Sequence, residues 1–420
     1  MIVRGVRMYG KSDLRFEEFD IGEMGEEELL ARVVTDSLCM STHKAALQGS
    51  AHRAVPDGID RHPVVIGHEF CAVVEKVGAR AATDLRVGDL FTVQPKMFLN
   101  GEIRGPGYSF AAYGGDITHI RVPREALEGN YLLPWRGAGY FHASLTEPYS
   151  CIISALRAQY HLADDHKAHV MGPRAGGCMA VLAGCGPMGI GMAQCAMAME
   201  AEARPGLIVV TDIDAGRVAR ARQLLAPQNG VRVEVVDTSG TEDAPALLRG
   251  LAGGRGFDDV MVMAPVPDVI AQADAISGVD SCISFFAGPT RKDFYAPVNF
   301  YDVHYNDKHI LGTSGGDVGD MREAIEKIAS GAVRAEAMVT HVGGLNAVAD
   351  TTLRLPSIPG GKKLIYCGVE MPLTAIDDFE EKGKTDPLFA QLHKLCAAKG
   401  GLWCLEAEQY LLANAKPIQA

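Results

Sequence analysis

The stretch PVVIGHEFCAVVEKVG, residues 63–78, decides how the surrounding chain folds. An apolar run and Gly67 are followed by the pair His68–Glu69 and then by a second β-prone run. An imidazole and a carboxylate are costly to bury between two strands unless they are paired or bind a metal. Both groups are also ligands for zinc, which takes nitrogen, oxygen and sulfur donors. The stretch therefore indicates two strands that meet at a metal site.

A further candidate ligand, Cys39, lies 29 residues before His68 in a β-rich region, residues 1–62. Cys39 follows a β-prone run, so we expect it in a loop or at the start of a helix. A single cysteine is most often a buried free thiol. Its position upstream of His68–Glu69 shifts the interpretation towards a metal ligand.

Glu147 precedes Pro148 at the start of a predicted helix, residues 149–160. Proline suits the first helical turn, where its missing N–H would have no partner. Two interpretations of Glu147 remain open. It either stabilises the positive end of this helix or acts at the site as a metal ligand or proton acceptor.

Composition excludes several classes of protein. The 420 residues suffice for two or three domains, and the net charge of −12 argues against binding to nucleic acids or anionic membranes. No run approaches the roughly 20 apolar residues of a membrane span, and the N-terminus lacks the apolar core of a signal peptide. The ten cysteines form no CxxC pairs, which is typical of reduced thiols. We therefore expect a cytoplasmic protein without nucleic-acid or membrane partners.

From residue 178 onwards the sequence alternates between strands and helices. A predicted strand, residues 179–183, runs into a GxGxxG pattern that opens an apolar helix, and an aspartate follows 23 residues after the last glycine. This context is typical of a dinucleotide-binding loop, in which the aspartate holds the ribose hydroxyls and favours NAD over NADP. A glycine pair after the last predicted strand marks the sheet edge that a nicotinamide would pass. The predicted cofactor-binding residues are Gly184, Gly186, Pro187, Met188, Gly189, Asp212 and Gly315.

Further predicted strands complete a doubly wound parallel sheet. They comprise residues 231–236, 258–263, 281–287 and 309–313. Residues 297–320 contain a polar and aromatic cluster between two elements. It is either a loop at a cleft or subunit contact, or an ordinary polar turn.

Taken in order, these motifs resemble the zinc-dependent medium-chain dehydrogenases over about residues 1–370. Within that family the chain is similar to the sorbitol dehydrogenase branch and most similar to the L-sorbose-1-phosphate reductases. The stretches that carry this resemblance are DSLCMST, GHEFC, PGYSF, EPYSC, NFYDVHY, GTSGG and GGKKLIY.

The resemblance implies an α/β protein with a GroES-like, β-rich catalytic domain and a Rossmann domain with a doubly wound parallel sheet. The implied division is a first catalytic part at residues 1–154, the Rossmann domain at 155–316, a return to the catalytic domain at 317–370 and a helical C-terminal extension at 371–420. It further implies a homodimer or homotetramer.

The family roles carry over to particular residues of this chain. The implied zinc ligands are Cys39, His68, Glu69 and Glu147, of which Glu147 is a ligand or a near-ligand that exchanges with water. The implied catalytic residues are Ser41, His43, Glu69 and Glu147, with Ser41 passing on the substrate proton. His43 lies beyond Ser41, as a second proton carrier or as a surface residue.

Two departures from the family pattern concern the metal. Residues 87–122 contain no cysteine, so we expect one catalytic zinc and no structural zinc. Thr42 stands where an aspartate is common, so the support of the metal ligands must differ.

We therefore expect an oxidoreductase that transfers hydride between NAD(H) and a polyol phosphate or ketose phosphate, with NADP as an alternative cofactor. A dehydrogenase of unphosphorylated sugar alcohols and a non-enzymatic NAD-binding protein are the competing hypotheses. A phosphorylated substrate requires cationic groups, which otherwise are expected to be solvated surface charges. The candidates are Lys44, Arg104, Lys308, Lys362 and Lys363.

Overall fold

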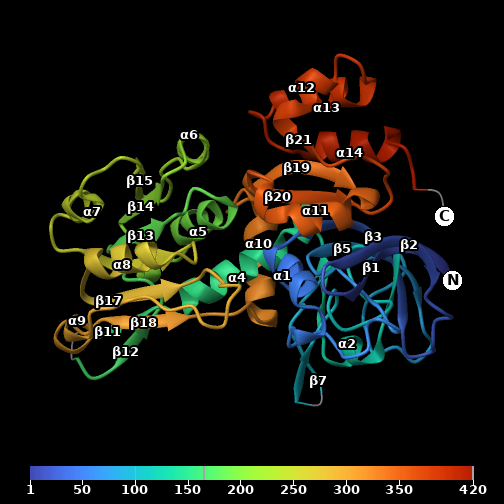
Figure 1. Ribbon diagram of the computed structural model, residues 1–420, viewed down its shortest axis with the longest axis horizontal. Coiled ribbons are helices and arrows are strands. Elements are labelled where there is room, and N and C mark those ends of the chain that lie inside the picture. The colour runs from blue at the N-terminus through green and yellow to red at the C-terminus, as the bar shows by residue number, and fades with distance from the viewer. Residues whose placement is uncertain (100, 164–165, 419–420) are drawn as a thin grey trace. The chain divides into compact units, whose positions relative to one another are not determined.

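The computed structural model describes residues 1–99, 101–163 and 166–418, and Figure 1 follows the chain through them. Residues 164 and 165 of the predicted Rossmann domain and residues 419 and 420 of the predicted extension lie outside the described residues.

The chain forms two compact units, each built on a sheet of its own. Unit 1 consists of Met1–Pro148, Asp317–Ala329 and Ala335–Ala420. Unit 2 consists of Tyr149–Gly316 and Ser330–Arg334.

Unit 1 contains an eight-stranded sheet to which both ends of the sequence contribute. In sheet order its strands are β10 (Leu132–Trp135), β6 (Leu90–Val93), β5 (Phe70–Val77), β3 (Leu29–Leu38), β20 (Lys362–Tyr366), β19 (Val339–Gly344) and β21 (Thr374–Ala375), while β9 (His119–Val122) also pairs with β3. The antiparallel pairing of β3 and β20 sets Leu38 opposite Lys363. The C-terminal strand β20 therefore lies next to the end of β3.

A smaller sheet of unit 1 has the order β2 (Asp13–Asp20), β1 (Ile2–Gly10) and β4 (Val64–Val65). Val6 of this sheet belongs to the same buried core as Leu29, Phe70 and Phe91 of the large sheet. All four side chains are fully buried, as expected for aliphatic and aromatic residues on inward-facing strand positions. The two sheets thus share one hydrophobic core.

The chain passes from the small sheet to the large one between β4 and β5. Gly67 in this crossing has a φ angle of +88°, and a Cβ atom there would lie 2.5 Å from the backbone nitrogen of Asp116. Only glycine fits this left-handed, crowded position. The next two residues, His68 and Glu69, are consequently held at the junction of the two sheets.

Short helices and one hairpin complete unit 1. The helices are α1 (Met40–Gln48), α2 (Arg124–Glu128), α3 (Tyr140–Ser144), α10 (Val318–Ala329), α11 (Val348–Arg354), α12 (Phe379–Lys382), α13 (Pro387–Ala397) and α14 (Leu405–Asn414), and the hairpin is β7 (Met97–Leu99) with β8 (Glu102–Arg104).

The C-terminal helices are fastened to the sheet by buried polar contacts. The indole nitrogen of Trp403 donates to the hydroxyl of Tyr366 on β20 at 2.8 Å. The Glu408 carboxylate accepts that hydroxyl and the backbone N–H groups of Tyr140 and Phe141, each at 2.9 Å. This part of the tail therefore packs within unit 1.

Unit 2 is a parallel sheet with helices between its strands, coloured from green to orange in Figure 1. Its order is β15 (Arg232–Asp237), β14 (Leu207–Asp212), β13 (Cys178–Leu182), β16 (Phe257–Val262), β17 (Ser277–Phe285) and β18 (His309–Gly312). The connecting helices are α5 (Pro187–Met197), α6 (Ala215–Leu224), α7 (Ala244–Leu251), α8 (Pro267–Ile276) and α9 (Phe300–Tyr305), and the hairpin β11 (Tyr160–Leu162) with β12 (His169–Met171) precedes β13. Helix α4 (Thr146–Arg157) contains the boundary between the two units.

The polar segment 297–320 was expected to be either a loop or a turn. Part of it is instead helical, because it contains helix α9. The Asn299 side chain accepts the backbone N–H of Tyr301 and so caps this helix. Asparagine is among the favoured residues at this position.

Among the described residues, no helix combines the length and apolar character needed to cross a membrane.

Candidate metal and cofactor sites

Cys39 occupies the junction between β3 and α1. Its backbone is extended, and its carbonyl accepts the N–H of Thr42 at 3.1 Å, so Cys39 is the residue that caps the helix. The strand ends and the helix begins at this point, as the sequence predicts. Cys39 as a whole residue is partly exposed, in contrast to the largely buried strand before it.

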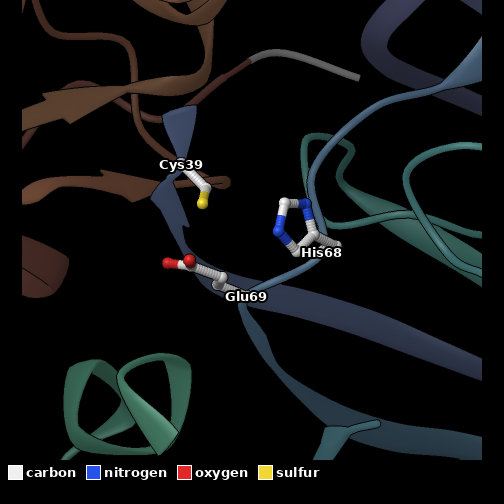
Figure 2. Close-up of side chains that lie close together, drawn as sticks. All are labelled: Cys39, His68 and Glu69. Carbon is white, nitrogen blue, oxygen red and sulfur yellow. The ribbon is translucent and has the colours of Figure 1, made fainter. Parts of the chain in front are cut away.

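Cys39, His68 and Glu69 come together although 28 residues separate Cys39 from His68. One ligand atom of each lies within 4.8 Å of the others. Figure 2 shows the Cys39 sulfur and the His68 ring turned towards the same space, with the Glu69 carboxylate beside them. His68 is 3% exposed and Glu69 is 1% exposed. A thiol, an imidazole and a carboxylate in this arrangement are a suitable donor set for zinc.

The hydroxyl of Thr42 determines which nitrogen of His68 is available. It lies 3.1 Å from Nδ1, and accepting the Nδ1 proton leaves the Nε2 lone pair free for a metal. Ser41 Oγ lies 3.1 Å from Nε2 and donates to Cys39 Sγ at 2.9 Å. Thr42 thus takes over the orienting role for which the family commonly uses a carboxylate.

Two further buried carboxyl groups lie beside this segment, and one of them, that of Asp36, binds its backbone. Asp36 accepts the N–H of Glu69 at 2.9 Å, and both Asp36 and Asp116 are completely buried. Burial raises the pKa of Asp116 to about 7 and that of Asp36 well above its usual range. The hydrogen bond to Asp36 helps to fix the peptide that carries the candidate ligands.

Lys362 forms a buried ion pair with Glu69. Its ammonium group donates to both carboxylate oxygens at 2.6 Å, and Ser37 donates to the same carboxylate. Burial by itself lowers the pKa of Lys362, but the charges of Glu69 and Cys39 outweigh it and raise the pKa. The lysine is therefore a cation inside the site, and the expectation that it is a solvated surface charge is wrong.

Glu147 lies in the first turn of α4 and is 9% exposed. Burial, followed by the charge of Glu69, raises its pKa to about 8. Electrostatic interactions with His68, Cys39 and Lys362 show that its carboxyl group lies near the cluster. Among the described residues, however, the group of ligand atoms within 4.8 Å of one another contains Glu69 and not Glu147.

His43 is buried rather than on the surface. Its Nδ1 lies 2.8 Å from the carbonyl oxygen of Thr352, and donation to that oxygen leaves Nε2 as an acceptor. Of its two predicted roles, that of a surface residue is wrong.

Most of the predicted phosphate-binding cations have partners inside the protein. Lys363 donates to three backbone carbonyls of residues 358–361, and Lys308 of unit 2 contacts Asp274 and Asp302. Both lysines are at most 5% exposed, so the expectation of solvated charges is wrong for them as well. Arg104 pairs with Glu102 on the exposed hairpin β7–β8.

Tyr108 is a site residue that the sequence analysis did not single out. Its hydroxyl lies 3.4 Å from His68 Nε2, and its ring packs at 5.0 Å from the His68 ring. The preceding Gly107 has a φ angle of +78°, and a Cβ atom there would lie 2.2 Å from the carbonyl oxygen of Gly67. The glycine in PGYSF was the available signal, because a close backbone approach requires it.

The candidate cofactor loop of unit 2 lies between β13 and α5. A Cβ atom on Gly184 would lie 2.6 Å from the Val181 carbonyl oxygen, and one on Gly189 would lie 2.1 Å from the Gly184 carbonyl oxygen. The first and third glycines are thus required by packing. A Cβ atom on Gly186 would meet nothing within 4 Å, so this middle position is open to a ligand.

The N-terminus of α5 suits an anion. Pro187 occupies the first turn, Met188 follows it, and no side chain caps the helix. Free N–H groups and the helix dipole favour a pyrophosphate at such a position. Asp212 at the end of β14 accepts the N–H of Cys185 at 3.3 Å, so its carboxylate lies beside the loop. Gly315, with a φ angle of +75°, follows the last strand.

The residues present fit both a metal ion and a dinucleotide cofactor. Around Cys39 the chain gathers acidic and sulfur donors out of water, an arrangement that favours a cation. Around Gly186 it leaves open space at uncapped N–H groups. A β-rich unit with such a donor set, combined with a parallel sheet that carries a dinucleotide loop, defines the class of metal-dependent dehydrogenases.

Comparisons with known proteins identify the family within this class. The profile of the alcohol dehydrogenase GroES-like domain matches residues 25–127, and that of the zinc-binding dehydrogenases matches residues 187–330. The L-sorbose 1-phosphate reductase of Klebsiella pneumoniae is 42% identical over 98% of both chains, and the mannitol-1-phosphate 5-dehydrogenase of Aliivibrio fischeri is 44% identical over 96% of both. The chain belongs to the zinc-dependent medium-chain dehydrogenases.

A solved structure extends the likeness to the fold. The 2R,3R-butanediol dehydrogenase of Bacillus subtilis superposes with a TM-score of 0.72 at 21% identity, covering 87% of this chain and 99% of the other. The predicted fold class and family are confirmed, and with them an oxidoreductase of the zinc-binding dehydrogenases.

Proposed function

We propose that the protein transfers hydride reversibly between NAD(H) and a secondary alcohol of a polyol phosphate, or the ketone of the corresponding ketose phosphate. The observation that carries this proposal is the cluster of Cys39, His68 and Glu69, with ligand atoms within 4.8 Å of one another. The printed activities of the two relatives at 42% and 44% identity support the substrate class.

Cys39, His68 and a carboxylate hold one zinc ion in this proposal. Glu69 is the carboxylate nearest to the other two ligands, and Glu147 is the alternative that takes its place when Glu69 stays on Lys362. Residues 87–122 supply no cysteine for a second, structural zinc.

When bound, zinc polarises the carbon–oxygen bond of the substrate and the nicotinamide exchanges the hydride. The protein itself moves the proton. The Ser41 hydroxyl takes the proton from the substrate hydroxyl and passes it on. A hydroxyl can accept and donate at once, and Ser41 already contacts both Cys39 and His68. His43 is proposed as the next carrier, with Nε2 as the accepting nitrogen.

In unit 2 the cofactor is held by the loop of Gly184, Gly186 and Gly189 with Pro187 and Met188, and by Gly315. Asp212 binds the ribose hydroxyls and repels a 2′-phosphate, which favours NAD over NADP.

A dehydrogenase of unphosphorylated sugar alcohols is the second candidate. It is favoured by the engagement of Arg104, Lys308, Lys362 and Lys363 with partners inside the protein. Sorbitol dehydrogenases are also among the relatives, with 27% identity over 52% of this chain for the Macaca fascicularis enzyme.

Steady-state oxidation of sorbitol 6-phosphate and of sorbitol with NAD distinguishes the two. We expect kcat/KM to favour the phosphate ester, and to fall to background in Cys39→Ser together with the zinc content. A preference for free sorbitol would exclude the phosphate proposal, and full activity without zinc would exclude the mechanism.

A cytoplasmic location, the four-part domain division and a homodimer or homotetramer remain predictions. Light scattering after gel filtration measures the oligomeric state directly.

A further inference from the structure

A phosphorylated substrate needs a cationic or hydrogen-bonding partner near the metal site. The buried lysines predicted for this role, and the exposed Arg104, already bind groups of the protein, as described above. Groups for this role are therefore expected on the side of the cluster that solvent reaches. Cys39, Ser41 and Tyr108 are partly exposed, whereas His68 and Glu69 are buried, so a substrate within unit 1 approaches past the first three.

Tyr108 carries a second aromatic ring on this accessible side. The His52 ring stacks on it at 5.4 Å between centroids, with only 13° between the planes. Tyr108 itself contacts His68 Nε2, the nitrogen left free for the metal. The stacked rings of Tyr108 and His52 therefore form a wall that extends outwards from His68.

His52 presents a hydrogen-bond donor from this wall. Its Nδ1 accepts the N–H of Ala54 at 3.3 Å, so the proton of the neutral ring is on Nε2. Burial and the adjacent charge of Arg53 lower the pKa of His52, which keeps the ring neutral. Phenol and imidazole N–H are groups that bind phosphate oxygens.

Arg53 adds a positive charge next to His52. It follows His52 in the chain, is exposed, and is near enough to lower the pKa of the imidazole. A guanidinium binds a phosphate group through two parallel hydrogen bonds.

The loop that carries these groups is fastened to the site. Ser109, next to Tyr108, donates to the carbonyl oxygen of Ala54 at 2.7 Å and accepts the N–H of Gly105 at 3.1 Å. Residues 52–54 therefore keep a fixed relation to Tyr108, as a specific binding wall requires.

We infer that His52 and Arg53, held against Tyr108, bind the phosphate group of the substrate. This inference rests on the proposed function and names the residues of this chain that make the site selective for a phosphate ester.

The test compares kcat/KM for sorbitol 6-phosphate and sorbitol in zinc-loaded, full-length protein, and the inhibition constant of inorganic phosphate against the ester. Arg53→Met removes the charge from an exposed position, and His52→Phe removes the donor while keeping a ring to stack on Tyr108. Arg104→Met is the matched control, because Arg104 is an exposed arginine of unit 1 that pairs with Glu102.

Loss of a charged hydrogen bond predicts that each variant lowers the ester-to-sorbitol ratio by about 10- to 100-fold. The inhibition constant of phosphate should rise by a similar factor, and Arg104→Met should stay within about twofold of the wild type. A merely structural effect would lower kcat/KM for both substrates by the same factor and leave the ester-to-sorbitol ratio unchanged.

The outcomes separate the two levels of the argument. If the wild type prefers free sorbitol, the proposed substrate class fails and this inference with it. If the wild type prefers the ester but Arg53→Met keeps that preference and the inhibition by phosphate, the inference alone is wrong. Should His52→Phe fail to fold, the measurements on Arg53→Met, a replacement at an exposed position, decide the result.

Discussion

Replacement of Lys362 by methionine tests the electrostatic design of the metal site. The ammonium group of Lys362 donates to both oxygens of Glu69 at 2.6 Å, and the two side chains are 7% and 1% exposed. Methionine is unbranched and apolar, so it fills a similar space without the charge. The Glu69 carboxylate would then remain in the core with Ser37 as a neutral donor.

Removing one partner of a buried ion pair costs about 3–5 kcal/mol, because the other charge stays buried without compensation. We expect K362M to lower the free energy of unfolding of unit 1 by this amount in metal-free protein. Both tryptophans, Trp135 and Trp403, are buried in unit 1, so their fluorescence in urea follows that unit. With a urea m-value of about 3 kcal/mol per molar, the midpoint falls by roughly 1–1.7 M.

Two controls give this measurement its meaning. Replacing Lys362 and Glu69 together by methionine should recover most of the loss, because an apolar pair of similar volume is often as stable as a buried ion pair. Arg354→Met breaks an exposed pair with Asp350 and should cost less than about 1 kcal/mol. The reasoning is refuted if K362M unfolds within about 1 kcal/mol of the wild type, or if the double replacement costs as much as the two single ones added.

Three further predictions concern other parts of the chain. Thr42→Val removes the hydroxyl that orients His68 and should weaken zinc binding by about 10- to 100-fold in a chelator competition, and an unchanged affinity would contradict its role. Burial, with the charge of Lys363 second, lowers the pKa of His341 to about 4 from 6.5, so its contribution to stability is complete above pH 6.5 and is lost as the pH falls towards 4. Because this side chain is only partly buried, His341→Gln should reduce the acid-induced loss by about 1–2 kcal/mol in urea midpoints between these pH values, and an unchanged pH dependence would speak against it. Asp212→Ala should raise the ratio of kcat/KM for NADP over NAD by about tenfold, whereas a wild type that prefers NADP would overturn the assignment.

The sequence predicts those parts of the fold that local patterns specify. The strand expected at residues 179–183 is β13 (Cys178–Leu182), and the helix expected after the glycine loop is α5. Buried parallel strands are short apolar runs, and a glycine-rich turn marks the entry to the helix. Neither signal depends on distant residues, which explains the agreement.

The chemistry around the candidate ligands was less predictable, because it depends on contacts between distant segments. Lys362 reaches Glu69 across 293 positions of the sequence, and nothing near either residue announces the pair. His43 illustrates the same limit, since its partner Thr352 lies 309 positions away. A charged residue in an isolated stretch of sequence is usually exposed, and that general tendency gave the wrong environment for the lysine.

Tyr108 shows a different limit. The glycines around it indicate an irregular loop, but only the backbone approach of Gly107 to Gly67 turns its hydroxyl towards His68. Glycine permits a left-handed conformation without stating what the chain approaches. The sequence therefore indicated that the backbone at Gly107 is constrained, but not which residue it approaches.

The pairing of β3 with β20 joins the N-terminal ligands to the C-terminal part of unit 1, and this connection has an electrostatic reason. Cys39, Glu69 and Glu147 bring thiol and carboxyl groups into a region that largely excludes water, and such a group is stable only with compensating positive charge. Lys362, at the start of β20, supplies one such charge directly at Glu69. A metal ion bound by Cys39 and His68 would supply the remainder, so the lysine and the metal are complementary partners of the same acidic cluster. A chain that ended before β20 would therefore lose the charge balance of its metal site even if it retained all four candidate ligands.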